Sequence, residues 1–151
     1  MPQPLSRVYL HTVFSTKERR PFLSDAGVRA EMHAYLGGTL KALGSEVIAV
    51  GGVDDHAHLL HTLGRFGVIA DMVREVKHSS SVWVHKRFPA LRNFHWQAGC
   101  SVFSVSHSLV QRVKRYVQNQ AAHHRKLSFM DELREFFRKH EVEYDERYVW
   151  D

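Results

Sequence analysis

The sequence lacks the features of secreted and membrane proteins. Its 151 residues include one cysteine, Cys100, so no disulfide can form within the chain. We expect that side chain to be small and buried. No stretch approaches the ~20 apolar residues that a transmembrane helix needs, and no basic segment followed by a long apolar one begins the sequence. These absences predict a cytoplasmic protein without a membrane partner.

Repeats, linkers and low-complexity segments are also missing, which predicts one domain over residues 1–151. Basic residues exceed acidic ones, with 21 Lys and Arg against 16 Asp and Glu, so the formal net charge is +5. A basic surplus favours a polyanionic partner, usually nucleic acid. A basic enzyme surface without such a partner would have the same composition.

Hydrophobic periodicity predicts an α+β fold. Alternating apolar residues predict strands over 8–15, 46–53, 56–63 and 94–105. Amphipathic spacing with capping residues predicts helices over about 25–43, 68–84, 106–124 and 129–140. The order βαββαβ is the ferredoxin-like split βαβ arrangement, an antiparallel sheet with two helices on one face. Further helices follow at the C-terminal end.

The stretch DHAHLL raises the possibility of a metal site. His56 and His58 are two apart on a predicted strand, so their side chains point to the same face. Neutral imidazole is a good ligand for divalent ions, and the pair would form half of a site. Histidines that pack in the core or lie at the surface have the same spacing. His61 should point to the opposite face.

The stretch VKRYVQNQAAHHRK belongs to the third predicted helix. Tyr116 and Gln120 are four apart and share a helix face. They lie at the edge of a stripe expected to be buried, formed by Leu109, Val113 and Val117. Such a tyrosine usually packs with its hydroxyl in water, but the neighbouring basic residues suit a phosphate. His123 and His124 are expected to face DNA or solvent.

DHAHLL, followed about sixty residues later by YVQNQ, resembles the single-tyrosine HUH transposases of the 200/605-type insertion sequences, which include the REP-associated tyrosine transposases. HUH denotes histidine, a bulky apolar residue, and histidine. Further similarity lies in VFSTKERRPFL, VREVKHSSS, FHWQAGCSVFSVS and the tail SFMDELREFF. Ala57 stands where valine or isoleucine is usual, and it remains apolar.

The resemblance implies a metal-dependent transposase that nicks and rejoins single-stranded DNA at hairpin-bearing ends. It implies Tyr116 as the nucleophile, giving a 5′-phosphotyrosine link and a free 3′-hydroxyl. It also implies Mg²⁺ or Mn²⁺ held by three ligands, His56, His58 and Gln120. A phenol with a pKa near ~10 is a weak nucleophile at neutral pH, and a nearby cation helps it to react as phenolate. Asp55 becomes a candidate partner for a ligand histidine.

The family resemblance further implies a homodimer with sheets joined edge to edge and shared active sites, in which the Tyr116 helix reaches the partner's histidines. The alternative is a helix folded back on its own sheet. Within the domain, the core is expected over about 5–126 and a helical tail over about 127–151. Six basic side chains are candidate DNA contacts, namely Lys17, Arg19, Arg20, Lys77, Arg115 and Arg125. A solvated surface is the alternative for the loop residues and for Lys77.

Two other functions fit parts of the sequence. A non-catalytic ferredoxin-like module that binds single-stranded DNA or RNA would stack bases on aromatic residues of the central strands. This chain has His56 and His58 there instead. A metal enzyme unrelated to nucleic acid agrees less well with the basic composition and the YVQNQ motif.

Overall fold

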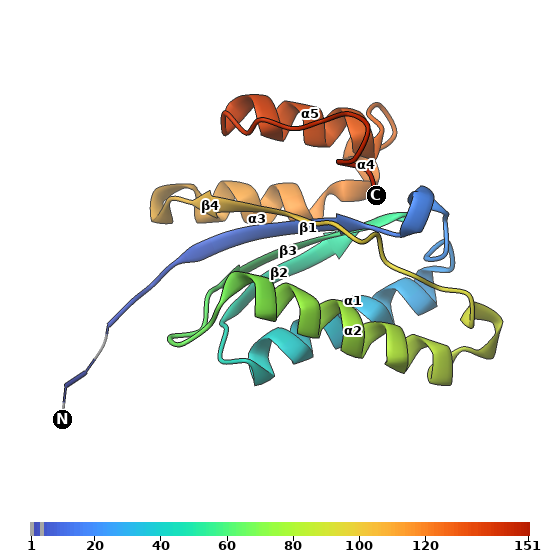
Figure 1. The fold of residues 1–151 in the computed structure, drawn as a ribbon, viewed down its shortest axis with the longest axis horizontal. Coiled ribbons are helices and arrows are strands. Elements are labelled where there is room, and N and C mark those ends of the chain that lie inside the picture. Colours follow the sequence, from blue (N-terminus) through green and yellow to red (C-terminus); the bar gives the residue numbers. More distant parts are fainter. Residues whose placement is uncertain (1, 4) are drawn as a thin grey trace.

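A four-stranded antiparallel sheet lies between two layers of helices in the computed structural model, which describes residues 2–3 and 5–151 (Figure 1). The strands are β1 (Tyr9–Ser15), β2 (Val47–Gly52), β3 (His56–Thr62) and β4 (Ser101–Val105), in the order β2-β3-β1-β4. The helices are α1 (Ala26–Ala42), α2 (Ile69–Arg87), α3 (Val110–Gln118), α4 (Gln120–His123) and α5 (Phe129–Lys139). The predicted ferredoxin-like βαββαβ core with added C-terminal helices is confirmed. None of the helices in the described part of the chain is long and apolar enough to cross a membrane.

The helices α1 and α2 cover one face of the sheet. Strand side chains alternate between faces, so Leu10 and Phe14 of β1 point into this layer with Leu59 of β3. They pack against buried residues of the two helices, including Met32, Leu36, Leu40, Met72, Val73 and Val76. His61 also faces this layer, where its Nε2 lies 2.9 Å from the Thr12 hydroxyl. The prediction that His61 points away from His56 and His58 is confirmed.

The helices α3 and α5 cover the opposite face. Helix α3 packs over β2 and β3, and α5 buries Phe129, Leu133 and Phe137 against Val13 of β1 and Phe103 of β4. Gly51 allows the close approach of α3, because a Cβ at this position would lie 2.1 Å from the carbonyl oxygen of Val117. The histidine pair of β3 therefore lies beneath α3, α4 and α5.

Four local predictions were wrong. The fourth strand is shorter than expected, because residues 94–100 form a loop whose backbone bonds to the end of β1, including Gln97 N–H to Ser15 O at 2.9 Å. The third helix is divided into a 3₁₀ turn, α3 and α4, with a break at Asn119. Leu109 lies in that turn and is 44% exposed, and Cys100 is exposed rather than buried.

Candidate functional site

His56 and His58 lie side by side on β3 and are completely buried. Each has its Nδ1 atom fixed by a neighbour. Asp55 Oδ1 lies 2.6 Å from His56 Nδ1, as expected for a partner of a ligand histidine, and His11 Nε2 lies 2.7 Å from His58 Nδ1. Both Nε2 atoms consequently face Glu132, at 3.5 Å from His56 and 2.9 Å from His58. This is the arrangement in which imidazoles present Nε2 to a metal.

Gln120 and Tyr116 complete the cluster from above the sheet. Gln120 Oε1 lies 3.2 Å from His56 Nε2. The Tyr116 hydroxyl donates a hydrogen bond to Glu132 and lies 3.0 Å from His123 Nε2. The two residues belong to separate helices, α3 and α4, yet the Gln120 amide donates to the Tyr116 carbonyl at 3.3 Å. The structure thus brings together the predicted nucleophile and all three predicted ligands within one chain.

Glu132 was not predicted from the sequence, although it lies at the centre of the cluster. Its carboxylate contacts His58 and the Tyr116 hydroxyl, and it is 1% exposed. One sequence signal was available. In the amphipathic helix α5, Glu132 occupies the same face as Phe129 and Leu133, three residues after the first and one before the second. A carboxylate on an apolar helix face requires a buried partner.

His124 corrects the expectation that both neighbouring histidines face DNA or solvent. Its Nε2 atom lies 2.9 Å from Gln120 Oε1 and 3.2 Å from Glu132 Oε2, and its Nδ1 lies 2.6 Å from the Leu127 carbonyl oxygen. The side chain is only 9% exposed, against 32% for His123. His124 therefore joins the cluster.

The protonation states in the cluster depend on the contacts of Glu132 with the histidines. Burial alone would raise the pKa of this carboxyl, but hydrogen bonds with His124 and His58 lower it well below its usual range. Burial opposes protonation of His124, whereas its hydrogen bond with Glu132 raises its pKa. Burial lowers the pKa of His58 to about 4. At neutral pH the cluster therefore holds the Glu132 carboxylate beside a neutral His58, and this carboxylate favours the protonated form of His124.

Tyr116 is held in its protonated form by the same surroundings. Burial raises the pKa of this phenol far above its usual value, and the adjacent charge and hydrogen bond of Glu132 raise it further. The Gln120 side chain acts in the opposite direction. Neutralising Glu132 or moving it away would favour the phenolate, which is the nucleophilic form of the side chain.

The donor set fits a divalent ion. Four side chains, His56, His58, His124 and Glu132, each offer a ligand atom within 4.8 Å of the others. Gln120 adds an amide oxygen beside His56 and His124. Imidazole nitrogens with carboxylate and amide oxygens suit first-row divalent ions.

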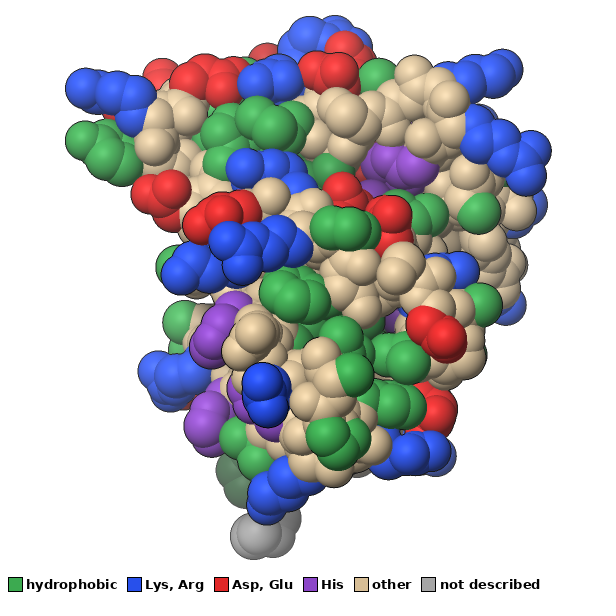
Figure 2. All heavy atoms as spheres, turned by 90° about the vertical axis from the view of Figure 1, so that its right-hand side faces the viewer, with side chains coloured by type: hydrophobic (Ala, Val, Ile, Leu, Met, Phe, Trp, Pro, Cys, Tyr) green, Lys and Arg blue, Asp and Glu red, His purple; other side chains and the backbone are tan. Residues whose placement is uncertain are grey.

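The predicted DNA contacts after β1 lie on a loop of fixed shape. Lys17 and Arg20 are exposed, whereas Arg19 is half-buried and donates to the Trp150 carbonyl oxygen at 3.2 Å. Glu18 and Arg19 have positive φ angles of 57° and 55°, which non-glycine residues rarely adopt. Figure 2 shows Lys and Arg side chains spread over this end of the molecule, with acidic side chains among them.

The other predicted DNA contacts are not all near the cluster. Lys77 belongs to α2, on the opposite face of the sheet from the histidine pair, and its ammonium donates to the carbonyl oxygens of Ala98 at 3.2 Å and Gly99 at 2.7 Å. Arg115 is exposed on α3. Arg125 is exposed directly after His124, beside the cluster.

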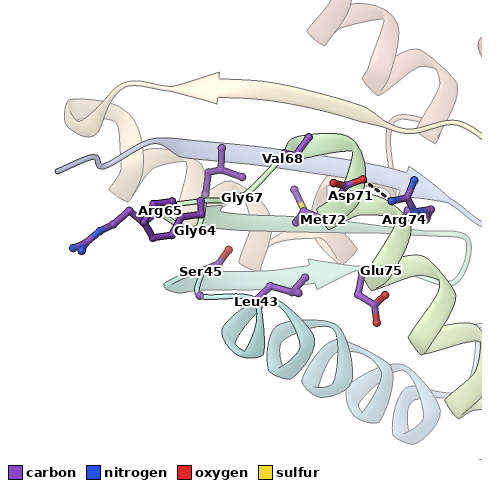
Figure 3. A pocket seen from close by; sticks show the side chains of 13 residues that line it. Leu43, Ser45, Gly64, Arg65, Gly67, Val68, Asp71, Met72, Arg74 and Glu75 are labelled. Carbon is purple, nitrogen blue, oxygen red and sulfur yellow. Dashed lines mark hydrogen bonds and ion pairs between the residues drawn. The ribbon is translucent and has the colours of Figure 1, made fainter. Parts of the chain in front are cut away.

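A separate hollow of about 950 Å³ lies where α1 ends and α2 begins (Figure 3). Leu43, Ser45 and Arg65 are among its lining residues, with Asp71 and Arg74 of α2. It is lined by none of the predicted site residues. The cluster around Glu132 is consequently the site that the sequence and the geometry share.

Comparisons with known proteins agree with this site. A family model described as IS200-like transposase matches residues 4–120. A crystal structure from Deinococcus radiodurans with a provisional transposase assignment is 25% identical, with a TM-score of 0.65, and the match covers 80% of this chain and 95% of that one. A REP-associated tyrosine transposase bound to a REP hairpin is 15% identical, with a TM-score of 0.55, over 78% of this chain and 68% of that one, and so shares the fold. No curated protein sequence matches the chain.

Proposed function

Because the chain belongs to the family of IS200-like transposases, we propose that it is a metal-dependent enzyme that nicks and rejoins single-stranded DNA at hairpin-bearing ends. The observation that supports this most directly is the convergence of Tyr116 with His56, His58 and Gln120 around Glu132. These residues come from β3 and from three helices, and one buried cluster contains both a phenol and a ligand set. The hairpin-bound relative of the same fold supports hairpin DNA as the substrate class.

Tyr116 forms the covalent link in this proposal. Its phenolate oxygen bonds to the phosphorus of a phosphodiester as the bond from phosphorus to the 3′ oxygen breaks. The phenol loses one proton and the departing 3′ oxygen gains one, so the products are a 5′-phosphotyrosine and a free 3′-hydroxyl. Because one phosphodiester replaces another, the strand can be rejoined by the reverse attack without ATP.

The proposed metal is Mg²⁺ or Mn²⁺, held by His56, His58 and Gln120. His124 and Glu132 are further donors within reach. A bound ion would stabilise negative charge on the scissile phosphate and the leaving oxygen. Asp55 and His11 keep both Nε2 atoms directed toward the cluster, and the neutral state of His58 leaves a nitrogen lone pair available. Removal of Glu132 from the phenol would also lower the pKa of Tyr116 toward its usual value.

The predicted basic side chains would bind the DNA backbone, some beside this centre and Lys77 on the opposite face of the sheet. Lys17, Arg19 and Arg20 lie on the loop after β1, and Arg115, Arg125 and Lys77 lie on helices or directly after one. The alternative function, a non-catalytic module that stacks bases on its sheet, agrees less well with the fold. Helices cover both faces of the sheet over the described residues, so the central strands have no open surface for bases.

Covalent trapping tests the proposed function. We expect the protein to form an adduct with a 3′-labelled single-stranded hairpin oligonucleotide when Mg²⁺ or Mn²⁺ is present, visible as a shifted band on denaturing gels, because the fragment on the 3′ side of the cut stays linked to the protein. A perfect duplex of the same sequence is the matched substrate, and it should give little adduct and bind more weakly. Equal reaction of duplex and hairpin, or no adduct with either metal, would contradict the proposal.

We also propose that the protein acts as a homodimer with shared active sites. The edge strand β4 pairs only with β1 within the described chain, which leaves its outer edge free to join a second copy. In the single chain Tyr116 contacts its own cluster through Glu132. A shared site requires α3 and α4 to exchange between subunits as one unit, so the chain would turn in residues 106–109, between β4 and α3.

Mixing two inactive variants tests the sharing of sites. His58→Ala and Tyr116→Phe each remove one component, so in a shared dimer half of the sites of each mixed dimer carry both defects and half are intact. Since Gln120 travels with Tyr116, the intact site also keeps its third ligand. We expect cleavage to return after subunit exchange, with mixed dimers confirmed by native mass spectrometry. Continued inactivity of confirmed mixed dimers would establish the within-chain site.

A further inference from the structure

The metal-ligand cluster reaches the molecular surface at His124. The other three members, His56, His58 and Glu132, are at most 1% exposed. His124 also lines a shallow surface hollow of about 310 Å³ between the start of α1, the turn from β2 to β3, and α4. A strand of DNA that approaches the cluster along this side meets the hollow first.

Two arginines face this hollow from different elements. Arg29 comes from the first turn of α1, and Arg125 follows α4. The Arg29 guanidinium is held in place by the carbonyl oxygens of Leu23 at 2.7 Å and Ser24 at 3.3 Å. Its orientation is therefore fixed before any ligand binds, which reduces the entropy lost on binding.

The remaining lining agrees with a small anion. Ser24 contributes a hydroxyl, Val53 and Ala121 contribute apolar walls, and Asp54 is the one acidic lining residue. Two guanidinium groups outweigh one carboxylate, and guanidinium is the side-chain group that best matches the oxygens of a phosphate. A water molecule occupies ~30 Å³ in the liquid, so the hollow has room for a phosphate group with water around it.

We infer that this hollow binds one phosphate group of the DNA strand, next to the phosphate that is cut, and that Arg29 and Arg125 are its positioning residues. The inference rests on the proposed function and adds Arg29, a substrate contact that the sequence did not indicate. Binding there would guide the strand along His124 toward Tyr116. Arg29 was not among the predicted DNA contacts, because its position beside Arg125 depends on the packing of α1 against the turn from β2 to β3.

The proposed contact can be tested by neutralising the phosphates of the DNA one at a time and measuring the affinity. The protein carries Tyr116→Phe, so only binding is measured, by fluorescence anisotropy. Hairpin oligonucleotides each carry one uncharged methylphosphonate linkage, at successive positions around the cleavage point. We expect one linkage near that point to weaken binding about tenfold when neutralised. With Arg29→Gln added, the unmodified DNA should bind about tenfold more weakly, and neutralising that linkage should weaken binding less than in the parent, because only Arg125 still contacts it.

Two other variants complete the experiment. Arg125→Gln should give the same linkage-specific loss of binding. Because the Arg125 side chain is exposed, its replacement leaves the hydrogen bonds from Arg29 to Leu23 and Ser24 in place. Lys41→Gln, at the far end of α1, removes an exposed charge outside the hollow and should leave the pattern unchanged. The slope of log affinity against log salt is negative, and each lost phosphate contact should make it less negative by about 0.7.

The inference is wrong if both arginine variants bind unmodified DNA as the parent does, or if neutralised linkages affect the parent and variants equally. This result differs from failure of the proposed function. If Arg29→Gln shows the linkage-specific loss but the protein with intact Tyr116 never forms an adduct, the phosphate contact stands and the transposase chemistry does not.

Discussion

Replacement of Tyr116 by Phe should abolish adduct formation while the protein stays folded and continues to bind DNA. The substitution removes only the hydroxyl, and no other group at the site can replace the nucleophile, so the rate of strand cleavage should fall by ~10⁴-fold or more. The aromatic ring keeps its contacts with His11 and Phe136. Loss of the hydrogen bond to the charged carboxylate should lower the free energy of unfolding by about 2 kcal/mol. Denaturing gels of the labelled hairpin measure the adduct.

Tyr148→Phe provides the matched control, because Tyr148 is exposed in the tail and far from the ligand set along the chain. It should form adduct at the rate of the unmodified protein. An undiminished yield of adduct in Tyr116→Phe would mean that another residue is the nucleophile. Peptide mapping of the cross-linked protein would identify that residue.

Replacement of His58 by Ala should remove divalent-metal binding and cleavage together. Thermal unfolding with and without Mn²⁺ separates this effect from folding. At a Mn²⁺ concentration one hundred times its Kd, binding stabilises the native protein by about 2.7 kcal/mol, and the variant should lose this increment. The metal-free variant should also be less stable by about 2–4 kcal/mol, because a cavity forms in a buried site and Glu132 loses a partner.

His61→Ala is the control on the same strand. It also removes a buried imidazole, but from the face of the sheet that is opposite the cluster. Its metal-free stability should fall by a similar amount, and its stabilisation by Mn²⁺ should be retained. If His58→Ala keeps the Mn²⁺ increment, His58 is a core residue and the ligand set is wrong.

The sequence predicted the elements whose pattern is local. Strands β1 to β3 and helices α1 and α2 follow from periodicity and caps, such as Asp25, whose carboxylate accepts from the Val28 N–H at 3.0 Å. The fourth strand was overextended because Phe94 and Trp96 are buried in a loop. Periodicity alone does not distinguish a buried loop from a strand, since both contain alternating apolar residues.

The candidate site was predicted in part for the same reason. His56 and His58 share a strand, so their spacing alone indicates a common direction. Glu132 lies 74 residues after His58 and reaches it only because α5 folds back over the sheet. His123 and His124 are adjacent and look alike in the sequence. Only the break after α3 turns His124 inward.

The position of α5 over the cluster would make DNA binding depend on the fraction of molecules in which Glu132 does not block the site. If the protein acts as proposed, Glu132, which lies between the Tyr116 hydroxyl and His58, must leave this position before a phosphodiester can contact both. The molecules in which Glu132 has left are the open fraction. The apparent affinity is then the intrinsic affinity multiplied by the open fraction, and every tenfold change in that fraction is worth about 1.4 kcal/mol. The apolar contacts of Phe137, which hold α5 over the sheet, would then influence how tightly DNA binds without touching it. Loosening them would tighten binding and weaken the fold, which would tie the affinity for DNA to the stability of the protein through one helix.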